Sequence, residues 1–244
     1  MRILITNDDA AYASALPDLI RWCRKLGEVT CVVPRYEQSG KSHGIELHKP
    51  YEVTQLELAP DITVWAVDST PADCVRFALL GLKQEFDLCI SGINKGFNIG
   101  TDMIYSGTVG AACEAVGLGL KAIALSTSPG YYDHAHEQLD RVFDFVFSNK
   151  LLDQWNLYNI NIPPQPQSIR ITRQGSAYYS DDYKELESGL YMPMGKCVHQ
   201  DNGSDELDTN MTIRGHITVT PITIDKTNLQ VYRALQAQSL EERK

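Results

Sequence analysis

The sequence has no uninterrupted apolar stretch close to the roughly 20 residues that a membrane-spanning helix needs. Two acids interrupt the apolar run near its beginning, so we expect no signal peptide there. Basic residues are also scarce, because 22 Lys and Arg stand against 31 Asp and Glu and leave a formal net charge of −9. We therefore expect neither a membrane partner nor nucleic-acid binding, whether by bulk charge or through a sequence-specific module.

Paired cysteines of the Cys-x-x-Cys type are missing as well, although the chain contains six cysteines. Four of them lie inside apolar segments, at positions 31, 74, 89 and 113. That placement is typical of small buried side chains in a reducing compartment, and it predicts a cytoplasmic protein without disulfides. Potential metal ligands occur in the stretch 133–137 and at Cys197 and His199. The stretch opens an amphipathic helix and the pair has no complement, so we expect neither to bind a metal.

Neither of the two common nucleotide-binding glycine motifs follows an apolar run in this sequence. The lack of Gly-x-x-x-x-Gly-Lys-Ser/Thr disfavours a P-loop nucleotidase, and the lack of Gly-x-Gly-x-x-Gly disfavours a dinucleotide oxidoreductase. An anionic substrate would therefore need a metal ion or a helix terminus to hold it.

Short apolar runs and helical patterns alternate over the first two-thirds of the chain. The runs lack polar alternation, as strands buried on both faces of a parallel sheet do, and they cover 2–6, 29–33, 63–67, 87–91 and 122–126. The helical patterns cover 16–26, 72–82, 109–116 and 139–147. Ser14 and Thr70 are the expected caps of the first two helices. This alternation predicts a doubly wound, mostly parallel α/β sheet.

The character of the chain changes after Pro163-Pro164. Residues 165–210 are polar, and they are followed by one strand pattern at 216–222 and one helical pattern at 228–240. We expect a core of residues 1–164 and a C-terminal extension of residues 165–244. The extension, a hairpin with a last strand and a tail helix, is expected to pack on the core or on a neighbouring subunit.

Oxygen-bearing side chains follow the predicted strands at their carboxyl ends, where open parallel sheets bind ligands. Asp8 and Asp9 end the first strand, Ser39 lies in the loop after the second, and Asn94 follows the run 87–91. Adjacent acids leaving a buried strand are costly without a cation, and oxygen ligands suit magnesium, manganese or calcium. The simpler alternative is that either acid caps the following loop. Taken with the other two loops, the acids favour a metal site.

The turn Ser106-Gly107-Thr108 precedes a predicted helix and offers free N–H groups and hydroxyls to an anion. By itself it would be an ordinary helix cap. Beside the acids it predicts a phosphate site.

Seven short motifs occur in the order of a known family and span residues 3–221: 3–9, 33–34 with 39–40, 68–74, 91–100, 105–112, 159–163 and 219–221. In these motifs the sequence resembles the SurE family, the survival-protein nucleotidases. The resemblance implies a Rossmann-like fold whose C-terminal extension is exchanged between subunits, and hence a homodimer or homotetramer. It implies a metal-dependent phosphatase, a 5′-nucleotidase, whose small-molecule substrates are nucleoside 5′- and 3′-monophosphates.

The resemblance also implies roles for individual residues. One divalent ion, Mg²⁺ or Mn²⁺, would be held by Asp8, Asp9, Ser39 and Asn94. The phosphate would contact Gly40, Asn98, Ser106, Gly107 and Thr108. We expect water to attack phosphorus with Asp8 or Asp9 as the catalytic proton acceptor, and direct attack by Asp8 is the alternative. Two other functions stay open: a nucleotide-binding module without catalysis, and a metal-dependent hydrolase of another ester or amide.

Two positions depart from the family pattern. Ala10 and Ser69 stand where the family has glycine, and neither is an implied ligand. The sequence leaves open the base preference, the ratio of 5′ to 3′ activity, any exopolyphosphatase activity and the ion used in the cell.

Overall fold

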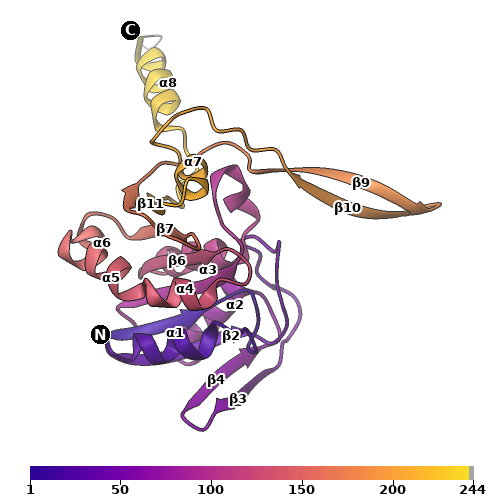
Figure 1. Cartoon of the computed structure of the whole chain (residues 1–244), viewed down its shortest axis with the longest axis vertical. Coiled ribbons are helices and arrows are strands. Elements are labelled where there is room, and N and C mark those ends of the chain that lie inside the picture. Colours follow the sequence, from indigo (N-terminus) through magenta and orange to yellow (C-terminus); the bar gives the residue numbers. More distant parts are fainter. Residues whose placement is uncertain (242–244) are drawn as a thin grey trace.

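The computed structural model describes residues 1–241, and one nine-stranded sheet organises them (Figure 1). The strand order is β3-β4-β2-β1-β5-β6-β7-β11-β8. The bounds of these strands are β1 Arg2–Thr6, β2 Glu28–Pro34, β3 Val53–Ala59, β4 Ile62–Val67, β5 Leu88–Lys95, β6 Lys121–Thr127, β7 Leu157–Ile162, β8 Ile169–Ile171 and β11 Ile217–Pro221. A separate two-stranded hairpin consists of β9 Tyr179–Glu187 and β10 Leu190–Cys197.

The helices lie mostly between successive strands of the sheet. Their bounds are α1 Leu16–Cys23, α2 Pro71–Arg76, α3 Gly107–Gly117, α4 Tyr132–Glu137, α5 Leu139–Ser148, α6 Leu151–Gln154, α7 Asp208–Ile213 and α8 Leu229–Glu241. Two helices of other types complete them, the π-helical η1 Phe77–Gly81 and the 3₁₀-helical η2 Gly100–Tyr105.

The centre of the sheet is parallel, as predicted. Strands β4, β2, β1, β5, β6 and β7 pair in parallel, whereas β3 runs antiparallel to β4 and β11 runs antiparallel to β7. The edge strand β8 pairs in parallel with β11. The prediction missed β3, because its side chains are only partly buried and its sequence shows no buried apolar run. The α/β class and the mostly parallel sheet are confirmed.

Helices cover both faces of the sheet, and β1 shows how one strand serves both. Ile3 and Ile5 pack in the core cluster that contains α1 and α5, while Leu4 packs in the cluster that contains α2 and α3. Successive side chains of a strand point to opposite faces, so a continuous apolar run is needed when both faces are covered. This explains why the central strands lack polar alternation.

The helix ends differ from the prediction in two places. α1 begins after Ala15, which makes no side-chain cap bond, so the expected cap at Ser14 is wrong. The helix expected over 72–82 divides into the α-helical α2 and the π-helical η1. The predicted cap at Thr70 is confirmed, because its hydroxyl accepts a hydrogen bond from the Asp73 N–H at 3.1 Å.

The C-terminal part leaves the sheet and returns to it. β8 and β11 join the main sheet, whereas the β9–β10 hairpin projects from the body and α8 extends away from it (Figure 1). Every residue of β10 is exposed. The predicted hairpin, last strand and tail helix are therefore all present.

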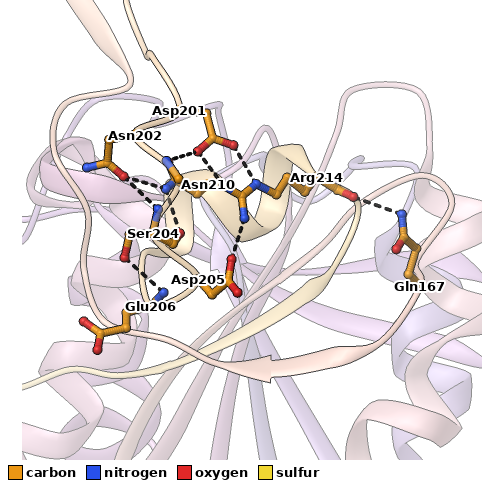
Figure 2. A network of polar contacts seen from close by, with 9 residues as sticks. Gln167, Asp201, Asn202, Ser204, Asp205, Glu206, Asn210 and Arg214 are labelled. Atoms are coloured by element: carbon orange, nitrogen blue, oxygen red, sulfur yellow. Dashed lines mark hydrogen bonds and ion pairs between the residues drawn. The ribbon is translucent and has the colours of Figure 1, made fainter.

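The root of the hairpin is braced by charge. Arg214, just after α7, donates to both carboxylate oxygens of Asp201 at 2.6 Å and to Asp205 at 2.6 Å, as Figure 2 shows. Asn210 donates to the side chain of Asn202 and to the backbone of Ser204. Paired bonds from one guanidinium are geometrically specific, so this network holds the returning segment on α7.

All six cysteines are free thiols, and those at 23, 31, 74 and 89 are buried. Burial raises the pKa of Cys89 to about 12, which keeps its thiol protonated and unreactive. Over residues 1–241, no helix has the length and apolar character needed to cross a membrane.

Candidate active site

A cavity of about 400 Å³ opens at the carboxyl ends of the central strands. From β1 the chain moves outward to β2 and later returns to β5 on the other side of β1. Such a change of direction leaves a crevice in which open α/β sheets bind ligands, and the volume falls within the usual range for small-molecule sites. Six of the nine predicted site residues line it: Asp8, Ser39, Gly40, Asn94, Asn98 and Ser106.

Asp8 is the most buried acid of this cavity, with 3% of its surface exposed. Its Oδ2 accepts a hydrogen bond from the Thr108 N–H at 3.1 Å, and its Oδ1 accepts a short one from the Thr108 hydroxyl. Burial nevertheless raises its pKa above the usual value. A Cβ at Gly107 would lie 2.9 Å from the Asp8 Cβ, so only glycine lets α3 begin this close to the acid.

Asp9 is half-buried beside Asp8. Its Oδ2 accepts a hydrogen bond from the Lys95 N–H at 2.8 Å, and its Oδ1 has no such partner among the described residues. Burial first, and then the charge of Asp8, raise the pKa of Asp9 to about 6, and Glu37 adds to the effect. Neither carboxylate has an ion-pair partner in the described part of the chain, so the cavity holds uncompensated negative charge.

The loop that carries Ser39 and Gly40 is held by backbone bonds. The Gln38 N–H donates to the Asp8 carbonyl at 2.8 Å, and the Ser42 N–H donates to the Tyr105 carbonyl at 3.0 Å. Both ends of the loop are thereby fixed to the strand and turn that carry the other site residues.

Hydrogen bonds to Glu114 of α3 fix the same loop from the other side. His43 Nε2 lies 2.6 Å from a Glu114 carboxylate oxygen, and Arg76 donates to the other oxygen at 2.9 Å. His43 therefore makes a hydrogen bond outside the cavity and is not one of its lining residues. The Ser39 hydroxyl donates to Glu37 at 2.8 Å.

The two predicted asparagines lie at the end of β5 and just beyond it: Asn94 is in the strand, and Asn98 is in the loop that follows. The Asn94 amide donates to the Gly96 carbonyl at 2.8 Å, which orients the amide and leaves its oxygen for a ligand. Asn98 is buried, its amide donates to the Ser126 hydroxyl at 2.9 Å, and its backbone N–H donates to Asn161 at 2.9 Å. The loop is thus preorganised by polar side chains that project from β6 and β7.

The predicted anion turn forms the N-terminus of α3. The Ser106 hydroxyl accepts from the Val109 N–H at 3.1 Å and keeps its proton for another acceptor. The positive end of a helix dipole favours an anion at this place. Both donors of Thr108 are already directed to Asp8, so Thr108 positions that acid, and its contact with phosphate stays a prediction.

The sequence interpretation missed several residues that line the cavity: Lys95, Phe97, Asp102, Tyr105, Ser128, Pro129, Tyr178 and Tyr179. Lys95 directly follows a predicted ligand, and this adjacency could have identified it. The tyrosines of the extension gave no local signal, because only the tertiary fold brings them to the core.

The donor set fits a hard divalent cation. The Asp8 carboxylate, the Asn94 amide and the Ser39 hydroxyl line one cavity, and the Asp9 carboxylate lies next to Asp8 in the chain. Such oxygens are the ligands of magnesium, manganese or calcium. Among residues 1–241 the structure forms no group of three or more His, Cys, Asp or Glu side chains around a point. The histidines of 133–137 and the pair Cys197 and His199 therefore do not assemble a site of that type.

Comparison with known proteins gives one consistent result. The family model for survival protein SurE matches residues 3–181. The 5′-nucleotidase SurE of Carboxydothermus hydrogenoformans is 38% identical over 252 residues, covering 97% of this chain and 95% of that protein. The 5′-nucleotidase SurE of Acinetobacter baumannii (strain SDF) is 38% identical over 260 residues, covering 97% and 99%. The crystal structure of the SurE protein from Aquifex aeolicus matches with a TM-score of 0.80 at 27% identity, covering 98% and 100%.

Proposed function

The chain belongs to the SurE family, and on that premise we propose that it hydrolyses nucleoside 5′- and 3′-monophosphates to nucleoside and phosphate. The relatives that share almost its full length carry the name 5′-nucleotidase. The observation that carries the proposal is the uncompensated pair Asp8 and Asp9, of which Asp8 lines one cavity with Ser106 at the N-terminus of α3. This pair would attract a cation, and the helix terminus would attract an anion.

The proposed cofactor is one divalent ion, Mg²⁺ or Mn²⁺. Its ligands would be Asp8, Asp9, Ser39 and Asn94, whose oxygens suit either ion. When bound, such an ion withdraws negative charge from a phosphate oxygen and lowers the barrier to attack at phosphorus. Without it, the charge of the two acids would repel the substrate.

The phosphate is proposed to lie between Ser106 and the loop of Asn98. Gly40, Gly107 and Thr108 belong to the same proposed set. Fixed N–H and hydroxyl donors can hold the phosphate oxygens without reorganisation during the reaction, so the rate gain comes mainly from positioning and electrostatics.

Water is the proposed nucleophile, and Asp9 the proton acceptor. Both Asp8 oxygens already accept hydrogen bonds from Thr108, whereas Asp9 keeps Oδ1 available. The water oxygen bonds to phosphorus as the bond to the nucleoside oxygen breaks, and that oxygen takes a proton from solvent. Quenching the enzyme during turnover of ³²P-labelled AMP tests this route, because the absence of label on the protein supports it. Phosphate trapped on Asp8 would establish an aspartyl-phosphate instead.

We further infer a division into a catalytic core of residues 1–164 and an extension of residues 165–244 that is shared between subunits. The projecting hairpin and α8 expose Leu190, Met192, Tyr232 and Leu235 by about half their surface, which favours burial against another copy in a homodimer or homotetramer. A light-scattering mass of two or four chains supports this inference, and a monomeric mass contradicts it. The free cysteines favour a cytoplasmic location, which fractionation of the source cells tests.

A substrate panel tests the activity directly. AMP, GMP, 3′-AMP, a short polyphosphate and a neutral ester are assayed for product release with Mn²⁺, with Mg²⁺ and with a chelator. The proposal expects metal-dependent phosphate release from the nucleotides. Binding of AMP without phosphate release would indicate a binding module, and hydrolysis of the neutral ester alone would indicate another hydrolase. Asp153→Asn, on the exposed surface away from the cavity, is the control and should keep the activity of the wild type.

A further inference from the structure

Part of the cavity wall comes from the C-terminal extension rather than from the sheet. Tyr178 and Tyr179, where β9 begins, line the cavity together with Asp8 and Ser106 of the core. Tyr105, at the end of η2, adds a third ring to the same wall. The proposed phosphate site therefore shares one cavity with these three tyrosines and with Phe97.

Asp102 fixes the two extension tyrosines to the core. Its Oδ2 accepts hydrogen bonds from the backbone N–H groups of Tyr178 at 3.0 Å and Tyr179 at 2.8 Å. Hydrogen bonds to a charged acceptor are about twice as strong as neutral ones. Because Asp102 lies in the turn that leads to Ser106, the rings are positioned relative to the proposed phosphate site.

A second connection lies one turn earlier in the core. The Gly100 N–H donates to both carboxylate oxygens of Asp208, and the Gly175 N–H donates to one of them at 2.8 Å. A Cβ at Gly100 would lie 1.9 Å from the Ser176 carbonyl oxygen, so the backbone of the extension passes directly against this glycine. These contacts therefore fix the position of the segment before Tyr178 relative to the start of η2.

The segment that follows β10 supports the ring of Tyr178. Tyr178 stacks on His199 with ring centroids 5.9 Å apart and planes at 29°. His199 lies two residues before Asp201, which Arg214 binds just after α7 (Figure 2 shows the Asp201–Arg214 pair). Tyr178 in turn meets Tyr179 edge to face, with centroids 4.8 Å apart and planes at 86°. Ring pairs at such distances prefer this geometry.

The outer two rings remain available to a ligand. Tyr105 and Tyr179 expose 56% and 52% of their surface although both line the cavity. No hydrogen bond of either phenol is needed to hold its ring, because the backbone contacts above fix both segments.

We propose that Tyr105 and Tyr179, with Tyr178 as their brace, form the subsite for the base of the substrate. This inference rests on the proposed function and adds to it the part of the ligand that the extension recognises. An aromatic face stacks on any base, and replacing such a ring by alanine typically weakens binding about 5- to 150-fold. The subsite therefore predicts acceptance of several bases, with purines held more tightly than pyrimidines because they offer a larger face.

Steady-state kinetics with two substrates tests the subsite. AMP carries a base, whereas glycerol 2-phosphate is a phosphomonoester without one. In Tyr179→Ala and Tyr105→Ala we expect KM for AMP to rise about 10-fold or more with little change in kcat, and both constants for glycerol 2-phosphate to stay within about twofold. Tyr179→Phe should restore the KM for AMP, because stacking needs the ring and not the hydroxyl. Tyr183→Ala, on the exposed β9 strand, is the matched control.

Three outcomes would overturn the subsite: equal losses on both substrates, no loss on AMP, or the same loss in Tyr183→Ala. Calorimetry with adenosine separates this inference from the proposed function, because it needs no turnover. If the wild type releases no phosphate yet binds adenosine, and Tyr179→Ala does not, the function fails and the subsite stands. If the wild type hydrolyses AMP and adenosine binds both proteins equally, the subsite fails and the function stands.

Discussion

Two regions use similar residue types in different ways. One is the row of carboxyl-terminal strand ends that carries Asp8 and Asn98, which we term the sheet edge, and the other is the projecting C-terminal extension. At the sheet edge, Asp8 and Asn98 are almost wholly buried and are held by several hydrogen bonds each. In the extension, Arg214 is braced at the root, but every residue of the adjoining β10 is exposed. One region is complete within a single chain, whereas the other is rigid at its base and open along its length.

The difference indicates that the sheet edge is preorganised for catalysis, whereas the hairpin is free to contact another surface. Polar groups fixed before the substrate arrives can stabilise charge without reorganisation. The apolar side chains of an exposed hairpin contribute to stability only when another surface covers them. Tyr178 and Tyr179 stand at the boundary, because Asp102 joins them to the site while their strand continues into the exposed hairpin.

Asp8→Asn should give the largest effect and should act only at the sheet edge. Asparagine keeps an oxygen to accept from Thr108 but loses the charge that would hold the divalent ion. We expect kcat to fall about 10³-fold with Mn²⁺, as for loss of a major electrostatic group. The melting temperature without metal should not fall, because burial of the uncompensated Asp8 charge is itself unfavourable. Near-wild-type turnover would remove Asp8 from the mechanism.

Arg214→Met should give the complementary result, a loss of stability without a loss of chemistry. Methionine keeps the apolar stem but leaves Asp201 and Asp205 without their partner. We expect a lower free energy of unfolding, together with faster amide exchange in residues 198–214. Arg173→Met is the control, because Arg173 is 65% exposed and pairs only with Glu206. A drop in kcat on glycerol 2-phosphate would contradict the separation of the two regions.

The sheet edge should also carry a pH signature that the extension lacks. The pKa of Asp9 is raised to about 6 in the folded protein, from the ordinary aspartate value of 3.8. The folded state thus binds this proton more tightly, so the stability from Asp9 is full below about pH 4 and is lost as pH rises through about 6. In the presence of a chelator, the wild type should be more stable at pH 5 than at pH 7.5, by about 1 kcal/mol after screening.

Thermal melts of wild type and Asp9→Asn, each at both pH values, measure this contribution. The substitution should remove most of the difference, because the asparagine does not titrate. An unchanged difference would assign the effect to other acids, Asp208 included, whose pKa is also raised by burial. Added Mn²⁺ should stabilise the wild type most at the higher pH, where the carboxylates are charged.

The sequence predicted the sheet edge better than the extension for a physical reason. Continuous apolar runs identify β1 and β5 in the sequence. Because parallel strands bring their carboxyl ends together, Asp8 and Asn94 could be predicted to lie at one site. Tyr178 and Asp102 could not, because their meeting depends on the path of a polar segment without periodicity. The missed strand β3 and the wrong cap at Ser14 have the same origin, since neither position is fixed by a strong local pattern.

The smallest predicted effect concerns Ala10, which stands where the family has glycine. Ala10 has a φ of +73°, a left-handed conformation that costs a residue with a Cβ roughly 1–2 kcal/mol. The conformation is held from both sides, because the Asn7 amide donates to the Ala10 carbonyl at 3.0 Å and the Ala13 N–H donates to it at 3.2 Å. Ala10→Gly should therefore stabilise the fold, by about 0.5–1 kcal/mol once the added freedom of the unfolded glycine is subtracted. Urea unfolding measures the change, and Ala13→Gly, at a position with negative φ, should destabilise instead. If Ala10→Gly also lowers kcat, the strain at this turn helps to aim Asp8 and Asp9, and the separation between stability and chemistry would break at the residue nearest the acids.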